Sequence, residues 1–171
     1  MKQPTQRDSP GEVVYLAVGS NLGRRVENIK RAVRELKRRP EIEVEALSSL
    51  YRSRPMYHLR QPDFVNYVVR LRTTLSPREL LANCQAIEQV LGREETFPNG
   101  PRIVDLDILS FGKIVLDSAD LKIPHPRLQE RHFVLIPWAE LNPGWVHPLL
   151  AKSVKRMLAE AGPNPGVRPL K

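Results

Sequence analysis

The chain has a single cysteine, Cys84, among its 171 residues. An internal disulfide is therefore excluded, and this scarcity of cysteine is typical of proteins from a reducing compartment. No hydrophobic run approaches the ~20 residues that a membrane-spanning helix needs, and the opening MKQPTQRDSPGE lacks the apolar segment of a signal peptide. We therefore expect a cytoplasmic protein that does not engage a membrane.

Two common nucleotide-binding motifs are missing as well. The stretch AVGSNLG follows a strand-like run, but it fits neither G-x-x-x-x-G-K-[ST] nor G-x-G-x-x-G, so we expect a tight turn that packs beside a site. The histidines also lack the spacing of zinc ligands. His58, His132 and His147 form no such pattern with Cys84, which argues against a zinc site.

What the chain has in excess is positive charge, with a formal net charge of +8. Nucleic acid, an anionic membrane surface or a polyphosphate substrate would each suit such a protein. Charge alone does not choose among them, because the most basic stretch, RRVENIKRAVRELKRR, has the pattern of a helix with one solvated face. The length and the hydrophobic fraction of 41% are those of one globular domain.

Periodicity predicts four strands and two helices in the order βαββαβ. The strands are expected at EVVYLAVGS, IEVEALSSLYRS, FVNYVVRLRTTL and around DLDIL, and the helices at residues 24–39 and from Ser76 to about Leu91. This order is typical of an α+β, ferredoxin-like fold, in which two helices cover one face of an antiparallel sheet. A short helix near IPWAEL and an amphipathic stretch, LLAKSVKRMLAEAG, are C-terminal additions. We expect one domain at residues 13–162, between flexible segments at 1–12 and 163–171.

The segment NGPRIVDLDIL carries two aspartates on a strand-like run. Side chains alternate along a strand, so Asp105 and Asp107 point the same way, with Cα atoms roughly 6.5–7 Å apart. Two carboxylates held so close repel each other, and a hard cation such as Mg²⁺ would neutralise them, completed by substrate phosphates. The alternative is a solvated edge strand that uses its charges against aggregation.

Neighbouring residues favour phosphate chemistry at this strand. Arg93 and Arg102 bracket the polar loop that leads into it, where guanidinium groups could stabilise a transferring phosphate. Surface ion pairs with Glu94 or Glu95 are the alternative for either arginine.

Aromatic and polar side chains offer a second kind of site. Phe64 and Asn66 share one face of a predicted strand, where they could stack a flat heterocycle and read its edge, or else serve the core. His125 lies between two prolines and could contact a phosphate or cap a turn. Arg131 and Phe133 share the face of a possible strand or turn, adding a cation and an aromatic ring.

Several segments together resemble the 6-hydroxymethyl-7,8-dihydropterin pyrophosphokinase family of folate biosynthesis. They are VYLAVGSNLG, SSLYRSRPM, QPDFVNYVV, IEQVLGR, NGPRIVDLDIL and IPHPRLQERHFVLIPW, in that order. The resemblance implies transfer of pyrophosphate from ATP to the hydroxymethyl group of the pterin, with AMP as the other product and two Mg²⁺ ions taking part. The partners that it implies are these two substrates, and we expect a monomer.

The same resemblance assigns roles to individual residues. Asp105 and Asp107 would hold the two metal ions, and together with Arg93 and Arg102 they would form the catalytic group. The ATP-binding positions would be Gln85, Glu88, Arg93, Arg102, Ile108, His125 and Arg131. The pterin-binding positions would be Ser53, Met56, Phe64, Asn66 and Phe133, with Asn66 reading the pterin edge and the two phenylalanines enclosing the ring.

The chain departs from the family pattern in the loop at 93–100. Many members carry a further arginine and a tryptophan before G-P-R, where Glu95 and Asn99 are nearest here and the loop is one residue shorter. Pro126 replaces a frequent tyrosine, and Asp120 lies near a place where bacterial relatives can have arginine. These departures bear on how the loop closes over ATP.

Two other classes of protein fit parts of the sequence. A basic βαββαβ domain is also the outline of an RNA-recognition motif, but that reading needs aromatic residues on the third strand, where this chain has FVNYVVRLRTT, and carboxylates on its sheet would repel phosphate. We therefore expect no nucleic-acid partner. A different metal-dependent phosphoryl-transfer enzyme is the other alternative, although such enzymes usually supply their acids from separate strands.

Overall fold

The computed structural model describes residues 11–94 and 96–171. Its centre is an antiparallel sheet in the order β5–β1–β4–β3–β8, with β2 also paired to β4. The strands of this sheet are β1 (Glu12–Ser20), β2 (Ile42–Leu47), β3 (Tyr51–Ser53), β4 (Phe64–Thr73), β5 (Asp105–Phe111) and β8 (Arg168–Pro169). A small ribbon, β6 (Leu116–Asp117) with β7 (Lys122–Ile123), follows β5.

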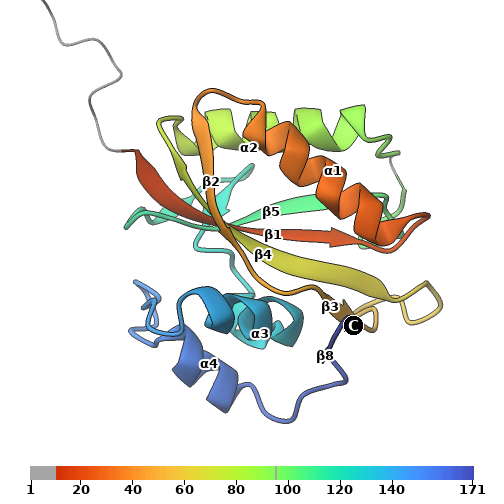
Figure 1. Ribbon diagram of the computed structural model, residues 1–171. Coiled ribbons are helices and arrows are strands. Elements are labelled where there is room, and N and C mark those ends of the chain that lie inside the picture. The colour runs from red at the N-terminus through yellow and green to blue at the C-terminus, as the bar shows by residue number, and fades with distance from the viewer. Residues whose placement is uncertain (1–10, 95) are drawn as a thin grey trace, which may run out of the picture.

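Helices cover both faces of this sheet (Figure 1). On one face lie α1 (Arg25–Lys37) and α2 (Pro77–Val90), and on the other lie α3 (His132–Leu141) and α4 (Val154–Glu160), with a 3-10 turn at Leu128–Glu130 before α3. The predicted ferredoxin-like fold is therefore confirmed, although its second strand is divided into β2 and β3, and α3 and α4 are the C-terminal additions.

Alternation along the strands supplies two separate cores. Val65, Tyr67 and Val69 of β4 pack toward α1 and α2, whereas Val68 points to the opposite face and packs with Trp138 of α3. Because successive strand residues face opposite ways, each long strand stabilises both layers at once.

The start of α2 follows from its sequence. Ser76 is the N-cap, and its hydroxyl accepts a hydrogen bond from the backbone N–H of Glu79, whose carboxylate accepts one from the N–H of Ser76. Pro77 occupies the first turn, and Gly92 adopts a φ of 90° just after the C-cap, a conformation that glycine allows at low cost. The helix fixes one wall of the site described below.

The predicted strand IEVEALSSLYRS is two strands instead of one. Its halves, β2 and β3, pair with different parts of β4, with a register shift between Val44 and Ala46 and a break at 48–50. Ser48 occupies the break, where its hydroxyl accepts a hydrogen bond from the N–H of Val68 at 2.9 Å. The serine hydroxyl thus serves as the acceptor that a backbone carbonyl would provide in a continuous strand. The alternation of apolar and polar residues gives no sign of such a contact.

The ends of the chain differ from the expectation in different ways. The segment at 163–171, expected to be a flexible tail, contributes β8, which pairs with β3, while the N–H of Leu170 donates to the carbonyl of Leu50 at 2.8 Å. Val167 is buried there. Of the expected flexible segment at 1–12, only residues 11 and 12 are among those described, and β1 begins at Glu12; Glu95 also lies outside the described residues.

Across residues 11–94 and 96–171, no helix combines the length and the apolar character that crossing a membrane requires.

Candidate active site

Most of the predicted site residues line one cavity of about 230 Å³, between the sheet and the start of α3. The predicted residues in its wall are Ser53, Met56, Phe64, Asn66, Arg102, Asp105, Asp107, His125, Arg131 and Phe133. They come from β3, β4, β5 and the segments around them, so the fold gathers side chains that are up to 80 positions apart in the chain. Placement in one cavity is what the predicted roles require.

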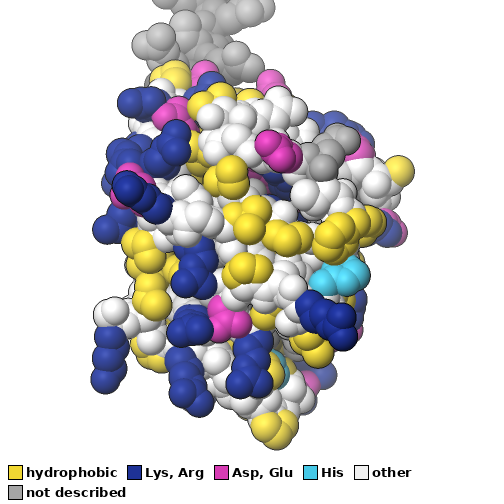
Figure 2. Space-filling model, turned by 90° about the vertical axis from the view of Figure 1, so that its right-hand side faces the viewer, with side chains coloured by type: hydrophobic (Ala, Val, Ile, Leu, Met, Phe, Trp, Pro, Cys, Tyr) yellow, Lys and Arg dark blue, Asp and Glu magenta, His cyan; other side chains and the backbone are white. Residues whose placement is uncertain are grey.

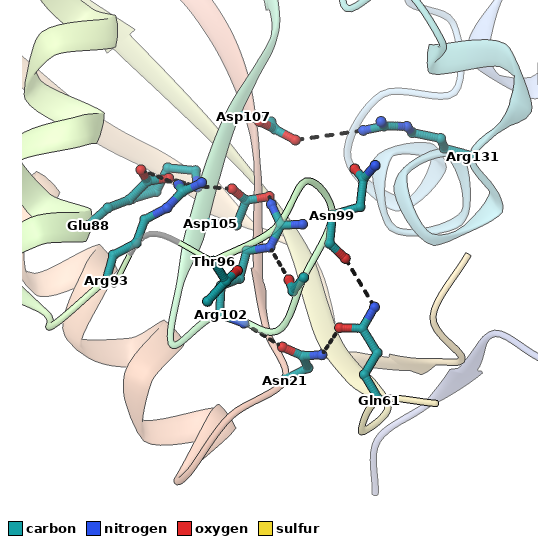
Figure 3. Close-up of polar contacts among 12 residues, drawn as sticks. Asn21, Gln61, Glu88, Arg93, Thr96, Asn99, Arg102, Asp105, Asp107 and Arg131 are labelled. Carbon is teal, nitrogen blue, oxygen red and sulfur yellow. Dashed lines mark hydrogen bonds and ion pairs between the residues drawn. The ribbon is translucent and has the colours of Figure 1, made fainter. Parts of the chain in front are cut away.

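The two aspartates lie on the same face of β5, as alternation predicts. Leu106 between them is buried in the core on the side of α1 and α2. Asp105 is held by two arginines: its carboxylate lies 3.2 Å from Nη1 of Arg93 and 3.1 Å from Nη1 of Arg102. Asp107 has a longer contact, 3.6 Å, to Nη1 of Arg131 (Figure 3).

Electrostatics distinguish the second aspartate. Enclosure by protein and the charge of Asp105 raise the pKa of Asp107 above its ordinary range, and the nearby arginines oppose this only in part. Among the described residues no three His, Cys, Asp or Glu side chains form a ready-made metal cage. Magnesium is usually held by one or two carboxylates together with substrate phosphates, so the carboxylate pair on β5 fits such an ion.

A second cavity of about 570 Å³ lies on the other side of Arg102 and is lined by Gln85, Glu88 and Arg93 from α2 and the turn after it. Glu88 is buried: its Oε1 accepts a hydrogen bond from the N–H of Leu106 at 2.7 Å, and its other oxygen contacts Nη1 of Arg93. Asn99 and Arg102 line both cavities, so the cavities adjoin at these two residues, and Arg102 there contacts Asp105.

The same face of the sheet presents an amide near aromatic rings, one strand away from the aspartates, since Asn66 of β4 and Asp105 of β5 both pair with Gly19 of β1. Nδ2 of Asn66 donates to the hydroxyl of Ser53 at 2.8 Å, and both side chains are buried. A Cβ at Gly19 would come within 2.8 Å of Oδ1 of Asn66, so the absence of a side chain there leaves room for this amide. Phe64 and Phe133 line the same cavity. The amide therefore has a fixed orientation beside two flat rings.

The segment before α3 supplies one further cation, Arg131, and a histidine, His125. The sequence left a strand or a turn open for Arg131 and Phe133, and the strand is wrong, because these residues lie at the N-cap and in the first turn of α3. The guanidinium of Arg131 lies 5.7 Å from the ring centre of Phe133, within the range of a cation–π contact. Burial, and next the charge of Arg131, lower the pKa of His125 to about 4, so its imidazole is neutral near pH 7.

One buried asparagine joins the segments around the cavity. Oδ1 of Asn21 accepts a hydrogen bond from the N–H of Arg102 at 2.8 Å, and Nδ2 donates to Oε1 of Gln61 at 3.0 Å. Nε2 of Gln61 donates in turn to the carbonyl of Asn99 at 3.1 Å (Figure 3). Of the stretch AVGSNLG, Ala17 to Ser20 end β1 and Asn21 to Gly23 form a turn beside the site, so the predicted turn is confirmed for these last three residues.

Sequence reasoning missed several lining residues and misplaced one. Ala17, Gly19, Arg54, Tyr57, Gln61 and Asn99 also line the first cavity. The glycine inside a strand was the available signal, because such a position often marks a close approach. Ile108 lines neither of these two cavities: its side chain packs in the core, which leaves only its backbone to face a nucleotide.

The face on the right of Figure 1 is predominantly basic. Figure 2 shows many more Lys and Arg than acidic side chains there, with a band of hydrophobic side chains across the middle. Two loops beside the cavities also touch: the rings of His58 and Phe97 are in edge contact, with centroids 4.9 Å apart. A basic surface of this kind attracts polyanions.

Comparisons with known proteins agree with this geometry. A family model described as 7,8-dihydro-6-hydroxymethylpterin-pyrophosphokinase (HPPK) matches residues 15–143. The chain is 48% identical over 130 residues to a 2-amino-4-hydroxy-6-hydroxymethyldihydropteridine pyrophosphokinase of Pseudomonas aeruginosa, which covers 76% of this chain and 80% of that protein. A protein of the same name from Synechocystis sp. is 43% identical over 157 residues, or 92% of this chain and 80% of that one.

Longer proteins contain a similar segment. The Folic acid synthesis protein FOL1 of Dictyostelium discoideum is 37% identical over 156 residues, which are 91% of this chain but only 23% of that protein. The chain thus spans about a fifth of the length of such curated relatives.

Solved structures show the same fold. A crystal structure of HPPK-DHPS in complex with substrates has a TM-score of 0.73 at 14% identity and covers 89% of this chain and 43% of that one. A Plasmodium falciparum HPPK-DHPS structure has a TM-score of 0.69 at 15% identity, over 91% and 46%. At such identities the likeness concerns the fold alone. The family model and the bacterial relatives go further, because they match most of this sequence, and the chain therefore belongs to the 7,8-dihydro-6-hydroxymethylpterin-pyrophosphokinase family.

Proposed function

We propose that this protein transfers pyrophosphate from ATP to 6-hydroxymethyl-7,8-dihydropterin, giving AMP and the pterin pyrophosphate, as a step of folate biosynthesis. The observation that carries the proposal is the composition of one cavity. Asp105 and Asp107 lie on β5 with Arg102 beside them, and Phe64 and Asn66 lie on β4, one strand away on the same face of the sheet. Phosphate chemistry and recognition of a flat heterocycle therefore meet within one small volume.

The heterocycle end explains the choice of acceptor. A pterin carries hydrogen-bond donors and acceptors along one edge, and the buried amide of Asn66 is the group that would pair with them. An analogue without those groups would leave the amide unsatisfied, which costs about 1–3 kcal/mol. Phe64 and Phe133 would enclose the ring, while Ser53 and Met56 complete this wall.

The phosphate end is built for charge. Arg93 and Arg102 reach Asp105 from two sides, and Arg131 reaches Asp107, so three guanidinium groups surround the place where phosphates would lie. Gln85 and Arg93 line the second cavity, which supports a nucleotide whose phosphates extend to the point where the two cavities meet. Asp105 and Asp107 would hold two Mg²⁺ ions, which neutralise phosphate charge and orient the oxygens of the transfer.

The proposed reaction needs no covalent intermediate with a side chain of the protein. Pyrophosphoryl transfer is limited by alignment of the acceptor hydroxyl and by stabilisation of charge, so no nucleophilic side chain is needed. His125, neutral near pH 7 because its pKa is lowered to about 4, can still donate a hydrogen bond from its ring N–H to a phosphate oxygen. The roles of Arg93, Arg102 and Arg131 are to hold the phosphates and balance the charge that develops on them.

A product analysis tests the proposal directly. Purified protein would be incubated with ATP, Mg²⁺ and 6-hydroxymethyl-7,8-dihydropterin, and nucleotides and pterins would then be separated. We expect AMP and pterin pyrophosphate in equal amounts, and neither product after chelation of the metal. Folded, metal-supplied protein that forms no AMP in response to the pterin would contradict the proposal and leave a related phosphoryl transfer with another acceptor.

A further inference from the structure

A buried carboxylate lies directly behind the strand that carries the two aspartates. Glu88, on α2, is only 5% exposed. Its Oε1 accepts a hydrogen bond from the backbone N–H of Leu106 at 2.7 Å, and its Oε2 contacts Nη1 of Arg93 (Figure 3). Glu88 lines the second cavity, but both of its oxygens are engaged by the protein itself, which leaves this carboxylate poorly placed to bind a substrate there.

The first contact fixes the backbone of β5 at a particular point. Leu106 is the residue between Asp105 and Asp107, and the two carboxylates project on the face opposite to its side chain. A hydrogen bond donated to a charged acceptor is stronger than one between neutral groups, at about 1.5–3 kcal/mol. Glu88 therefore links α2 to the backbone of β5 between the two aspartates, from which both carboxylates project.

The second contact fixes a guanidinium group. Nη1 of Arg93 lies between Glu88 and Asp105, 3.2 Å from Oδ1 of the latter. A metal cation that binds Asp105 would compete with Arg93 for the oxygens of this aspartate. Glu88 would still be available to Arg93 as a partner. Glu88 is thus the partner that would retain Arg93 at the site while its other contact changes to a phosphate.

We propose that Glu88 is a positioning residue of the phosphate-transfer site, which contacts neither substrate and acts through Arg93 and the backbone between the two aspartates. This inference rests on the proposed function, and it replaces the ATP-binding role that family resemblance implies for the position. A buried group that orients the ligands of a reaction centre commonly affects activity by about 10- to 100-fold without touching the substrate.

The substitution Glu88→Gln separates the two contacts. Glutamine has the same length and keeps an oxygen that accepts from the N–H of Leu106, but it turns an NH₂ group toward Arg93 and ends the ion pair. We expect kcat to fall by about 10- to 100-fold, with little change in the Kd of ATP measured without pterin and in the melting temperature. The matched control is Glu27→Gln, because Glu27 also pairs with an arginine on a helix but is exposed. Its activity should stay at the wild-type level.

A double-substitution cycle identifies the route. If Glu88 acts through Arg93, then Glu88→Gln should reduce kcat far less in a protein that already carries Arg93→Gln than in the wild type. If the two losses multiply, or if Glu88→Gln weakens ATP binding as much as it lowers kcat, Glu88 acts on the nucleotide directly and the inference is wrong. Wild-type kcat in Glu88→Gln would also overturn it.

A measurement without turnover keeps this inference distinct from the proposed function. Phenylglyoxal modifies accessible arginines, and mass spectrometry gives the rate at Arg93 alone. We expect slow modification of Arg93 in the wild type and faster modification in Glu88→Gln, while the rate at Arg34, an exposed arginine, is the same in both. Equal rates at Arg93 would refute the inference. A wild-type protein without pterin-dependent AMP formation, but with this difference, would instead contradict only the proposed function.

Discussion

Charge balance at the aspartate pair comes from residues in several separate segments. Three carboxylates, of Glu88, Asp105 and Asp107, face three guanidinium groups, of Arg93, Arg102 and Arg131. The distribution is uneven: Asp105 has two arginines near it, whereas Asp107 has one at 3.6 Å. Asp107 has the weaker ion pairing, so removing its negative charge should lower the free energy of unfolding less than removing that of Asp105.

The first prediction concerns that residue. Asp107→Asn removes one of two repelling charges and keeps the size of the side chain, so the melting temperature should be unchanged or slightly higher. If Asp107 holds a metal ion, the loss of several kcal/mol of charge stabilisation should lower kcat by at least ~100-fold. Thermal unfolding and the AMP assay measure the two effects. A clear loss of thermal stability would indicate a structural role for the carboxylate.

The second prediction concerns recognition of the heterocycle. Asn66→Ala removes the amide that Ser53 orients, so binding of the pterin should weaken by about 10- to 100-fold. Binding of ATP should change little, because Asn66 lies on β4, separated from the aspartates of β5 by β1, and it does not line the second cavity, to which we assign the nucleotide. Calorimetric titration of each substrate separates these effects. Equal weakening for both substrates would contradict the assignment of Asn66 to the pterin.

At the scale of the elements, predictions from sequence succeeded where one local rule decides the outcome. Alternation correctly placed Asp105 with Asp107 and Phe64 with Asn66, and the capping box correctly placed the start of α2. The split of the predicted strand at 42–53 escaped prediction, because a serine hydroxyl pairs there with the backbone of β4. Such a long-range side-chain contact leaves no periodic trace in the sequence.

The pairing of β8 escaped prediction for a related reason. The segment PNPGVRPLK has the composition of a loop, yet Val167 is 5% exposed and Arg168–Pro169 pairs with β3. A strand of two residues is too short for any periodicity, and its stability comes from the edge that β3 offers.

A third prediction tests whether this contact matters. Val167→Ala removes two buried methyl groups, which should lower the free energy of unfolding by about 1–2.5 kcal/mol. Denaturant unfolding measures the loss, and Val146→Ala serves as a control because Val146 is 55% exposed. Equal stability of the Val167→Ala protein and the wild type would mean that β8 is as loose in solution as the sequence suggests.

At the scale of the whole molecule, the site depends on segments that the sheet brings together. The turn after β1, the 54–62 segment before β4 and the loop before β5 are joined by the side chains of Asn21 and Gln61. Sequence reasoning predicted the chemistry of these loops but not their connection, since neither amide belongs to a motif with a chemical role. Buried polar groups that bridge segments are costly to leave unpaired, so such a link is specific to one arrangement of the loops.

The last prediction breaks this link in two steps. Asn21→Ala leaves the N–H of Arg102 without its acceptor and Gln61 without its donor, so the free energy of unfolding should fall by about 1–3 kcal/mol. Asn21→Asp keeps an acceptor for the N–H of Arg102 but loses the donor to Gln61.

If the position of Arg102 is what matters for transfer, kcat should fall strongly in Asn21→Ala and much less in Asn21→Asp. Asn83→Ala is the control, because its amide donates only within α2. Steady-state kinetics beside denaturant unfolding measures both effects. If kcat falls as much in Asn21→Asp as in Asn21→Ala, transfer depends instead on the hydrogen bond to Gln61, which joins the turn after β1 to the 54–62 segment.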